Sequence, residues 1–301
     1  MAGIFKRKQR KPWREYKELE GRWPEHHDQT LLNDIDGYIN KAKKEGRTIS
    51  DEVNIMLLGQ VKSGKSSTIN SFFSICQGEI ASRTKAGASN TSFTRRFFSH
   101  RGFGKLKNVV FFDVMGFELS KTQTMTSKVV LDCMKGDIAD GKLLGVDSPD
   151  DQILNFRKKK LIHCVMYCID AEDLVKEDIP AFGEKIRETE EDLRITNQER
   201  IVLVTKIDNI CKKVRKDIRK VFFSENVKKA VYKAADIFGV QVNHVFPVKN
   251  FTEEMKPDAF KSIPLLLALT EAVHFGIDFQ TSCKNQAEES DAFSGKWESS
   301  S

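Results

Sequence analysis

Apolar residues along this chain recur in short runs that alternate with segments of helical spacing. Several runs, such as 109–112 and 201–204, lack polar alternation, which is typical of strands covered on both faces. Helical stretches follow most of the runs, and this rhythm is typical of βα units. The pattern predicts an α/β fold with a doubly wound, mostly parallel sheet. The expected strands are at 53–58, 94–98, 109–113, 163–170, 201–206 and 244–248.

The ends of the chain differ in pattern from this central part. Apolar residues in 13–19 and 31–44 have partly helical spacing, which predicts helices that pack on the main domain. The polar, serine-rich end predicts a disordered tail. A stretch at 120–160 exceeds what a minimal nucleotide fold needs and is a candidate partner-specific surface. The predicted units are a disordered basic arm at 1–12, a helical lead-in at 13–50, a main domain at 51–277 and a tail at 278–301.

Composition limits the class of protein. The chain has 301 residues, of which 40% are hydrophobic and 31% charged, enough for a large globular core. It contains no run of about eighteen uncharged apolar residues and no apolar signal-peptide core, so we expect no transmembrane segment and a cytoplasmic location. The basic run 6–11 could contact nucleic acid or anionic lipid, but a solvated arm without a specific nucleic-acid partner is the favoured interpretation. Cys164 and Cys168 lack zinc-site spacing and are interpreted as buried thiols.

The residues from Gly59 to Ser66 match the phosphate-loop pattern G-x-x-x-x-G-K-[ST]. An apolar run precedes the loop and a helical run follows it, so a strand leads through a glycine-rich turn into a helix. Backbone N–H groups and the positive end of the helix dipole then converge on one point, where a polyphosphate can bind. The expected nucleotide-binding residues are Gly59, Lys62, Ser63, Gly64, Lys65, Ser66 and Ser67.

Each residue type in this loop has a physical role. Gly59 and Gly64 permit backbone angles and a close approach that a Cβ would obstruct. Lys65 can bridge the β- and γ-phosphates as a mobile charge. The Ser66 hydroxyl is placed to bind Mg²⁺.

A second motif follows the apolar run 109–112. Asp113 to Gly116 form a D-x-x-G element at the carboxyl end of that predicted strand. Asp113 can hold a water on Mg²⁺, and the Gly116 N–H can sense the γ-phosphate. A threonine between the two motifs should complete the metal site, and among Thr84, Thr91 and Thr94 we favour Thr91.

A third motif, Thr205-Lys206-Ile207-Asp208, follows the apolar run 201–204. Guanine-specific folds usually carry N-K-x-D here, with the aspartate on guanine N1–H and the exocyclic amine and the lysine stem along the base. Thr205 replaces the asparagine that braces the phosphate loop, so we expect somewhat weaker binding with specificity retained. By position, Lys249 and Asn250 should bring a backbone N–H to the guanine O6. An aspartate-capped turn at the end of a strand is the alternative interpretation.

The three motifs, in this order and each at the end of an apolar strand, predict a P-loop fold of the small-GTPase type that binds GTP or GDP with Mg²⁺. Together with the segments 87–91 and 162–165 and the pair Asp170-Ala171, they resemble the interferon-induced protein 44 and 44-like family over about 13–275. The resemblance implies a cytoplasmic, interferon-responsive GTP-binding protein with an antiviral or antiproliferative association. It also implies a GTP-binding domain without the amino-terminal TLDc domain of the longer family members.

The chemistry expected of this site is slow. Phe117 stands where many GTPases place the glutamine that orients the attacking water, and phenylalanine cannot hydrogen-bond to that water. We assign no catalytic residue, since Arg83, Arg95 and Arg96 near the switch are better interpreted as solvated side chains. A GTP-dependent switch with a nucleotide-dependent oligomer or protein partner is the favoured function. The alternatives are a non-hydrolysing scaffold and an ATPase or kinase, which Asp208 disfavours.

Overall fold

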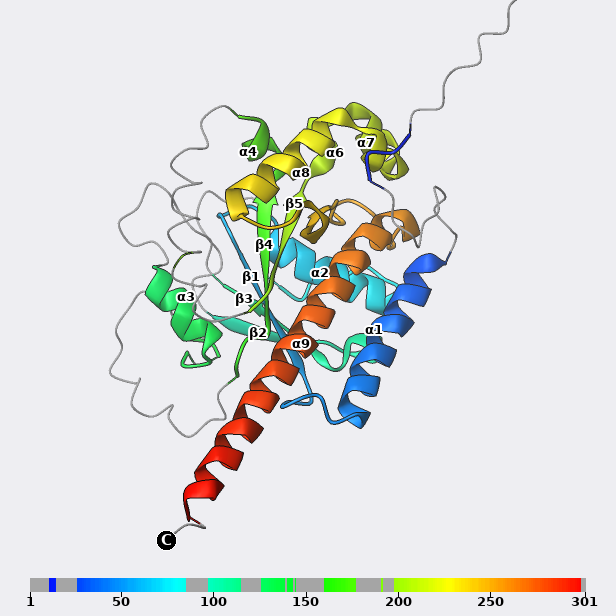
Figure 1. Ribbon diagram of the computed structural model, residues 1–301. Helices are drawn as coiled ribbons and strands as arrows, with labels where there is room; N and C mark the ends of the chain where they lie inside the picture. Colours follow the sequence, from blue (N-terminus) through cyan, green and yellow to red (C-terminus); the bar gives the residue numbers. More distant parts are fainter. Residues whose placement is uncertain are drawn as a thin grey trace, which may run out of the picture.

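The computed structural model shows one β-sheet between two layers of helices (Figure 1). The strands are β1 (Val53–Gly59), β2 (Phe98–Arg101), β3 (Val109–Asp113), β4 (Cys164–Asp170), β5 (Arg200–Thr205) and β6 (Val245–Pro247). The longer helices are α1 (His27–Lys44), α2 (Lys65–Gln77), α3 (Ser127–Met134), α8 (Glu225–Phe238) and α9 (Ala259–Glu298). The short helices are η1 (Gly104–Leu106), α4 (Ala171–Val175), α6 (Ile207–Ile210), α7 (Lys212–Lys216), η4 (Ile218–Phe223) and η5 (Val242–His244). The described residues are 11–14, 26–84, 97–114, 126–138, 140–142, 144, 160–176, 191 and 198–298, with side chains as far as 290.

The strands form one sheet in the order β2-β3-β1-β4-β5-β6. The β2–β3 pair is antiparallel and the other pairs are parallel. The carboxyl ends of β1, β3, β4 and β5 therefore meet at one edge, where α/β sheets bind their ligands. The predicted α/β fold with a doubly wound, mostly parallel sheet is confirmed.

Five of the six predicted strands lie where expected, and the second is wrong in position. The strand expected at 94–98 begins at Phe98 and runs to Arg101, while 94–96 lie outside the described residues. Phe98 pairs with Asp113 and Arg101 with Val110, so the strand forms a half-solvated edge. An edge strand of this kind does not need the apolar run by which the buried strands were recognised.

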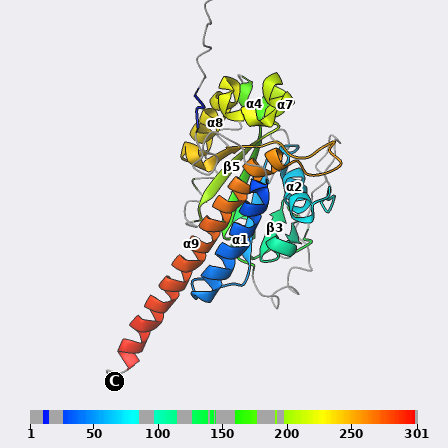
Figure 2. The ribbon, with the colours of Figure 1, turned by 90° about the vertical axis from the view of Figure 1, so that its right-hand side faces the viewer.

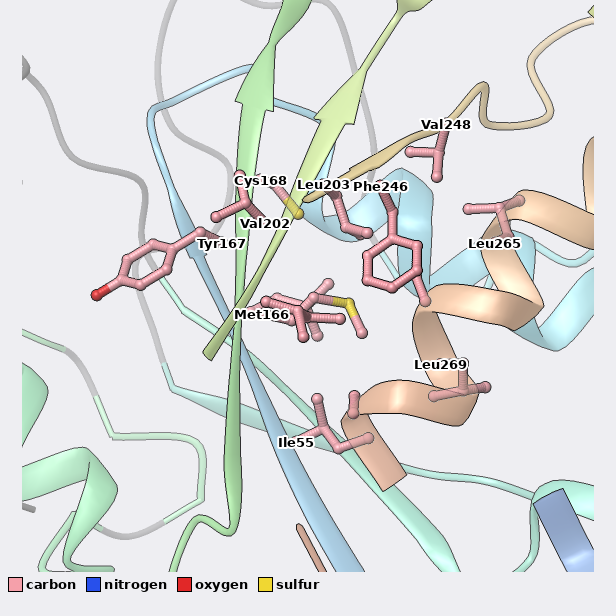
Figure 3. Close-up of a cluster of buried hydrophobic side chains, with 14 of the residues drawn as sticks. Ile55, Met166, Tyr167, Cys168, Val202, Leu203, Phe246, Val248, Leu265 and Leu269 are labelled. Carbon is pink, nitrogen blue, oxygen red and sulfur yellow. The ribbon is translucent and has the colours of Figure 1, made fainter. Parts of the chain in front are cut away.

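Helices cover both faces of the sheet. Met166 of β4 points toward Leu265 and Leu269 of α9, whereas the next residue, Tyr167, points to the opposite face (Figure 3). There the Tyr167 ring lies 4.9 Å from the ring of Phe238 on α8. This alternation follows the two-residue period of a strand and explains why the run has no polar positions.

Helix α1 lies along α9 over one face of the sheet (Figures 1 and 2). It begins at His27, four residues before the predicted start, and buries Leu31, Leu32, Ile35 and Ile39. In the predicted lead-in at 13–19, residues 15–19 lie outside the described part of the chain. Trp13 is anchored elsewhere, since its backbone N–H donates to the Phe222 carbonyl at 2.9 Å.

The expected disordered tail at 278–301 does not match the structure, because α9 continues as a helix to Glu298. Gln280 is fully buried, and its Oε1 accepts the backbone N–H groups of Ile49 and Ser50 at 3.1 and 2.9 Å. Thr281 and Lys284 donate to carbonyls of the same connection between α1 and β1. The polar side chains of this segment therefore satisfy backbone groups of the connection between α1 and β1.

The stretch 259–290 of α9 is long and apolar enough to cross a membrane by length and composition alone. However, 67% of its most apolar window is buried inside the fold. Leu265, Leu266 and Leu269 are among the residues that it buries against the sheet. Its apolar character is accounted for by this core position.

His163 joins β1, β4 and α9 at the amino-terminal end of the sheet. Its Nδ1 accepts the Asn54 backbone N–H at 3.0 Å and lies 3.2 Å from the Gln280 Nε2. Burial lowers the pKa of His163 to about 3, so the imidazole is neutral. The neighbouring Cys164 and Cys168 are buried free thiols, as predicted, and burial raises their pKa values. The segment 162–165 thus has a structural role and lies away from the carboxyl ends of the strands.

Candidate functional site

The phosphate loop turns at the carboxyl end of β1. Gly59 has φ 145°, and a Cβ at this position would lie 2.1 Å from the Cys168 carbonyl oxygen. Lys62 and Gly64 also have positive φ, at 67° and 95°. Glycine is required where the backbone both turns this way and passes so close to a neighbouring strand. The loop therefore has the tight curvature that directs backbone N–H groups toward a common point.

Helix α2 begins at Lys65 directly after this turn, with Gly64 as its N-cap. Gly64 has no side chain to satisfy the first N–H groups of the helix, which leaves them available to an anion. Ser63 adds a buried Oγ that has no hydrogen-bond partner among the described residues. The helix start thus combines unsatisfied donors with the positive end of the helix dipole.

The Lys65 ammonium lies inside the loop. Its Nζ donates to the carbonyls of Gly59 at 3.1 Å and Gln60 at 2.8 Å, and the side chain is 6% exposed. Burial lowers the pKa of Lys65, and the charge of Asp113 opposes that shift. A buried ammonium held by neutral carbonyls has a strong electrostatic preference for an anion.

The first two motifs meet through a hydrogen bond between Ser66 and Asp113. The Ser66 Oγ donates to the Asp113 Oδ2 at 2.6 Å. Asp113 is placed there because β3 pairs in parallel with β1, which aligns it with Leu57. A hydroxyl and a carboxylate are the hard oxygen donors that Mg²⁺ prefers. Two of the predicted metal-site residues are therefore in contact, while Thr91 and Gly116 lie outside the described residues.

Asn70 on α2 holds the segment that leads away from the helix. Its Oδ1 accepts the backbone N–H groups of Arg83 and Thr84 at 2.9 Å each. The Thr84 hydroxyl donates to the Ser66 carbonyl at 2.8 Å, beside the predicted metal position. The Arg83 guanidinium lies over the Phe103 ring at 4.0 Å. The other candidate switch residues, Thr94, Arg95 and Arg96, lie outside the described part of the chain.

The third motif, which the sequence predicts to recognise the base, follows β5 at the same edge of the sheet. Lys206 has a left-handed backbone, with φ 54°, and its Nζ is 2.5 Å from the Asp170 Oδ2. Asp208 pairs with Lys249, whose Nζ lies 3.0 Å from the Asp208 Oδ2. Asp208 and Lys249 are separated by 41 positions in the sequence, and the neighbouring carboxyl ends of β5 and β6 bring them together.

The phosphate loop is braced from this side by two side chains. The Thr205 Oγ1 lies 2.7 Å from the Ser63 carbonyl, close enough to donate to it. The Asn250 Nδ2 is 3.0 Å from the Thr68 Oγ1 and 3.4 Å from the Gly64 carbonyl. Both side chains are buried. The amide that the sequence predicts to be missing at position 205 thus has a counterpart at Asn250.

Sequence reasoning missed three polar side chains of this site. Asn70 fixes the exit from α2, Asp170 holds Lys206, and the Asn250 side chain reaches the loop for which only its backbone was considered. Asp170 had a signal, since it ends the apolar run of β4 in the same way that Asp113 ends β3. Asn70 and Asn250 had none, because their partners are separated from them in the sequence.

The arrangement fits a nucleoside polyphosphate with Mg²⁺. The loop and Lys65 supply cationic and N–H donors for phosphates, and Ser66 and Asp113 supply metal-binding oxygens. The Asp208 carboxylate lies on α6, which follows β5 at this edge of the sheet, on the side where a base would extend from such a phosphate. A Cβ on Gly59 or Gly64 would intrude on this space, as it would lie 2.8 Å from the Ser63 Oγ or 3.2 Å from the Asn250 Nδ2.

The chain is similar to a group of curated proteins, although no family model matches it. It is 24% identical to human interferon-induced protein 44-like over 262 residues, which are 84% of this chain and 57% of that protein. It is 23% identical to human interferon-induced protein 44, over 77% of this chain and 54% of that protein. The mouse protein 44 is 22% identical over 76% of the chain and 56% of its own length. These matches confirm the predicted resemblance, and the chain spans a little over half the length of these relatives.

A solved structure, that of Toc33 from Arabidopsis thaliana in complex with GDP and Mg²⁺, has a more distant likeness to this chain. It matches with a TM-score of 0.44 and 15% sequence identity, over 86% of this chain and 96% of Toc33. A likeness at this level is too remote to inform the function of the site.

Proposed function

We propose that this relative of interferon-induced protein 44 and 44-like binds guanine nucleotides with Mg²⁺ and acts as a GTP-dependent switch in an interferon-type innate immune response. The immune setting and a cytoplasmic location come from the names of its relatives and from the sequence prediction. The single observation that carries the binding proposal is the contact between Ser66 and Asp113 beside the buried Lys65. This contact brings together, from separate motifs, groups that can bind a phosphate and groups that can bind a metal ion.

Bound Mg²⁺ would neutralise charge on the β- and γ-phosphates. In the proposed complex the Lys65 Nζ exchanges its two carbonyl partners for phosphate oxygens, which offer a full negative charge in the same buried position. Ser66 and Asp113 exchange their mutual hydrogen bond for contacts with the metal and its water. The backbone N–H groups of the loop and of the first turn of α2 hold the remaining phosphate oxygens.

Selection of guanine is assigned to Asp208. Its carboxylate can accept two hydrogen bonds from guanine N1–H and the 2-amino group, whereas adenine presents no such pair of donors. Lys249 lies beside the carboxylate, so its ammonium must share Asp208 with the base or move aside. Asp170 fixes the Lys206 ammonium, which orients the lysine stem that we expect to lie along the base.

The proposed switch hydrolyses GTP slowly without a partner. Phe117 lacks a hydrogen-bonding group for the attacking water, and the described arginine near the loop, Arg83, lies over aromatic rings. A group that stabilises transition-state charge is worth roughly 10³ to 10⁵ in rate. Stimulation by a second copy or by a protein partner would supply it, and a turnover number that rises with protein concentration would support a second copy.

Calorimetric titration with GDP, GTP and ATP in the presence of Mg²⁺ tests the proposal. We expect GDP and GTP to bind and ATP to bind about 100-fold more weakly, because adenine offers the Asp208 carboxylate no pair of donors. Equal binding of ATP would favour the ATPase or kinase alternative, and no binding at millimolar GDP or GTP would overturn nucleotide binding itself. Phosphate release from bound GTP then distinguishes a switch from a non-hydrolysing scaffold.

A matched pair of lysine variants ties this titration to the loop. Lys65→Ala should abolish measurable binding while leaving the fold intact, because it removes a buried charge whose partners are two neutral carbonyls. Lys105→Ala, at an exposed position of η1, is the control and should bind as the wild type does. Equal nucleotide affinities of the Lys65→Ala and Lys105→Ala variants would show that the loop does not bind the nucleotide.

A further inference from the structure

A strongly basic surface lies beyond the nucleotide site, on α7, η4 and the first part of α8. Residues 212–233 contain nine lysines and arginines and two acidic residues. Their excess of positive charge is larger than the net charge of the whole chain, which is +6. We call this surface the basic face, and its exposed lysines are Lys212, Lys213, Lys216, Lys220 and Lys229.

Several of these lysines are not used by the fold. Among the described residues, the side chains of Lys212, Lys213 and Lys216 have no hydrogen-bond or ion-pair partner, and all three are exposed. By contrast, the two arginines of the basic face are engaged. The Arg215 Nε donates to the Asp208 carbonyl, and Arg219 pairs with Asp217 and lies over the Phe260 ring. The charges left for a partner are therefore those of lysines.

A second basic segment is joined to the same place from the other end of the chain. The Trp13 Nε1 donates to the Val221 carbonyl at 3.2 Å, and its ring lies 5.5 Å from that of Phe222 on η4. Lys11, two residues earlier, is exposed, and four further cations precede it in the sequence at positions 6, 7, 8 and 10. Figure 1 shows the anchored segment beside α7. The fold thus anchors Trp13, which follows this basic run in the sequence, beside the basic face about 200 residues away.

Two aromatic side chains are exposed on the same elements. Phe223, at the end of η4, is 44% exposed, and Tyr232 on α8 is 50% exposed. Aromatic rings near lysines are suited to the boundary between lipid headgroups and acyl chains, where one part of the side chain is apolar and the other is wet.

We propose that the basic face docks on the surface of a membrane that contains anionic phospholipids. Lysine ammonium groups are point charges without the planar fork with which arginine recognises single phosphates and base edges. They suit a diffuse layer of headgroup charge, in which each cation near the surface raises affinity about five-fold. Double-stranded RNA is the competing polyanion, and the test below includes it.

Docking here would bring the nucleotide site close to the membrane. Asp208 lies on α6, four positions before Lys212, and α6 and α7 are in contact at the carboxyl end of the sheet (Figure 1). Asp208 and the basic face therefore share one end of the molecule, while the amino-terminal ends of the strands face the other way.

Sedimentation with lipid vesicles tests the proposal. The wild type should bind vesicles of phosphatidylcholine with about 30 mol% phosphatidylserine at about 0.15 M salt, and should not bind pure phosphatidylcholine. The triple variant Lys212→Gln, Lys213→Gln, Lys216→Gln should lose about 100-fold in vesicle affinity. The matched control, Lys44→Gln, Lys105→Gln, Lys107→Gln, removes the same charge from exposed positions at the other end of the sheet and should bind as the wild type does.

The outcomes are separate from those of nucleotide binding. None of the six lysines is buried, so we expect both triple variants to fold. Thermal unfolding of the two variants checks this. An equal loss in the two triple variants would show a response to net charge alone and would overturn the basic face as a docking surface. Absence of wild-type binding to the anionic vesicles would also overturn it. Tighter binding of a short RNA duplex than of the vesicles would assign the face to nucleic acid and overturn the membrane proposal.

Discussion

At the scale of single residues, this site is a set of polar groups that hold one another in positions a ligand would use. Lys65 donates to loop carbonyls, and Ser66 donates to Asp113. Asp208 is paired with Lys249. Each pair keeps a buried or half-buried group satisfied, because an unpaired charge here would be costly. Ligand binding then exchanges partners, so single substitutions should separate recognition of the phosphates from recognition of the base.

Asp208→Asn should change base preference. The amide offers a donor where xanthine presents its 2-oxo group, and it loses an acceptor for the donors of guanine. We expect GTP affinity to fall about 100-fold and XTP affinity to rise until it exceeds that for GTP. Competition of a fluorescent GDP analogue by GTP and XTP measures both. If the order of preference stays that of the wild type, Asp208 does not read the base.

Asn250→Ala should weaken nucleotide binding without changing base preference. The substitution removes the amide beside Gly64 and Thr68, so the loop is less well held, and we expect a loss of about tenfold in GDP affinity. Asn209→Ala is the matched control, because Asn209 is exposed and its amide contacts Glu172 instead of the loop. Wild-type affinity in Asn250→Ala would show that Thr205 braces the loop alone.

His163 should make the fold sensitive to mild acid. Burial lowers its pKa to about 3 from an ordinary value of 6.5. Between these values the unfolded chain binds a proton that the folded chain does not, so the free energy of unfolding falls as the pH is lowered from about 6.5, by up to ~1.4 kcal/mol per pH unit. This stabilising contribution is complete above pH 6.5.

A substitution that keeps the acceptor isolates this proton. In His163→Asn the Oδ1 can accept the Asn54 N–H in place of the imidazole Nδ1. Urea unfolding at a series of pH values between 4.5 and 7.5 should show a slope shallower by about one proton than that of the wild type. Parallel slopes for the two proteins would place the acid sensitivity elsewhere.

At the scale of elements, the sequence predicted what depends on local pattern. The strand at 109–113 was placed to the residue, because β3 is buried on both faces and ends in the motif aspartate. The loop was recognised from its glycines and lysine, which act within eight consecutive positions. β2 was misplaced because it is a half-solvated edge strand. The Asn250 brace was missed because its partner, Thr68, is 182 positions away, and only the assembled sheet brings the two together.

At the scale of the whole molecule, α9 connects the two ends of the fold. It covers one face of the sheet beside α1, and its polar residues beyond the core hold the connection between α1 and β1. Composition alone indicated a disordered tail from 278, since polar residues that hydrogen-bond to the backbone of another segment have the same composition as those that face solvent. The helix thus contains a stretch that the fold needs and a stretch that extends past it (Figures 1 and 2).

Two truncations should separate these stretches. Ending the chain after Lys284 keeps the contacts of Gln280, Thr281 and Lys284 and removes positions whose described side chains are exposed, so we expect an unchanged Tm. Ending it after Ile277 leaves the N–H groups of Ile49 and Ser50 without their acceptor and removes a donor to Glu52, which should lower the Tm by several degrees. Differential scanning calorimetry of the two products decides. Equal Tm values would mean that the polar contacts of α9 with the 46–52 connection do not stabilise the fold and that the tail begins at 278 after all.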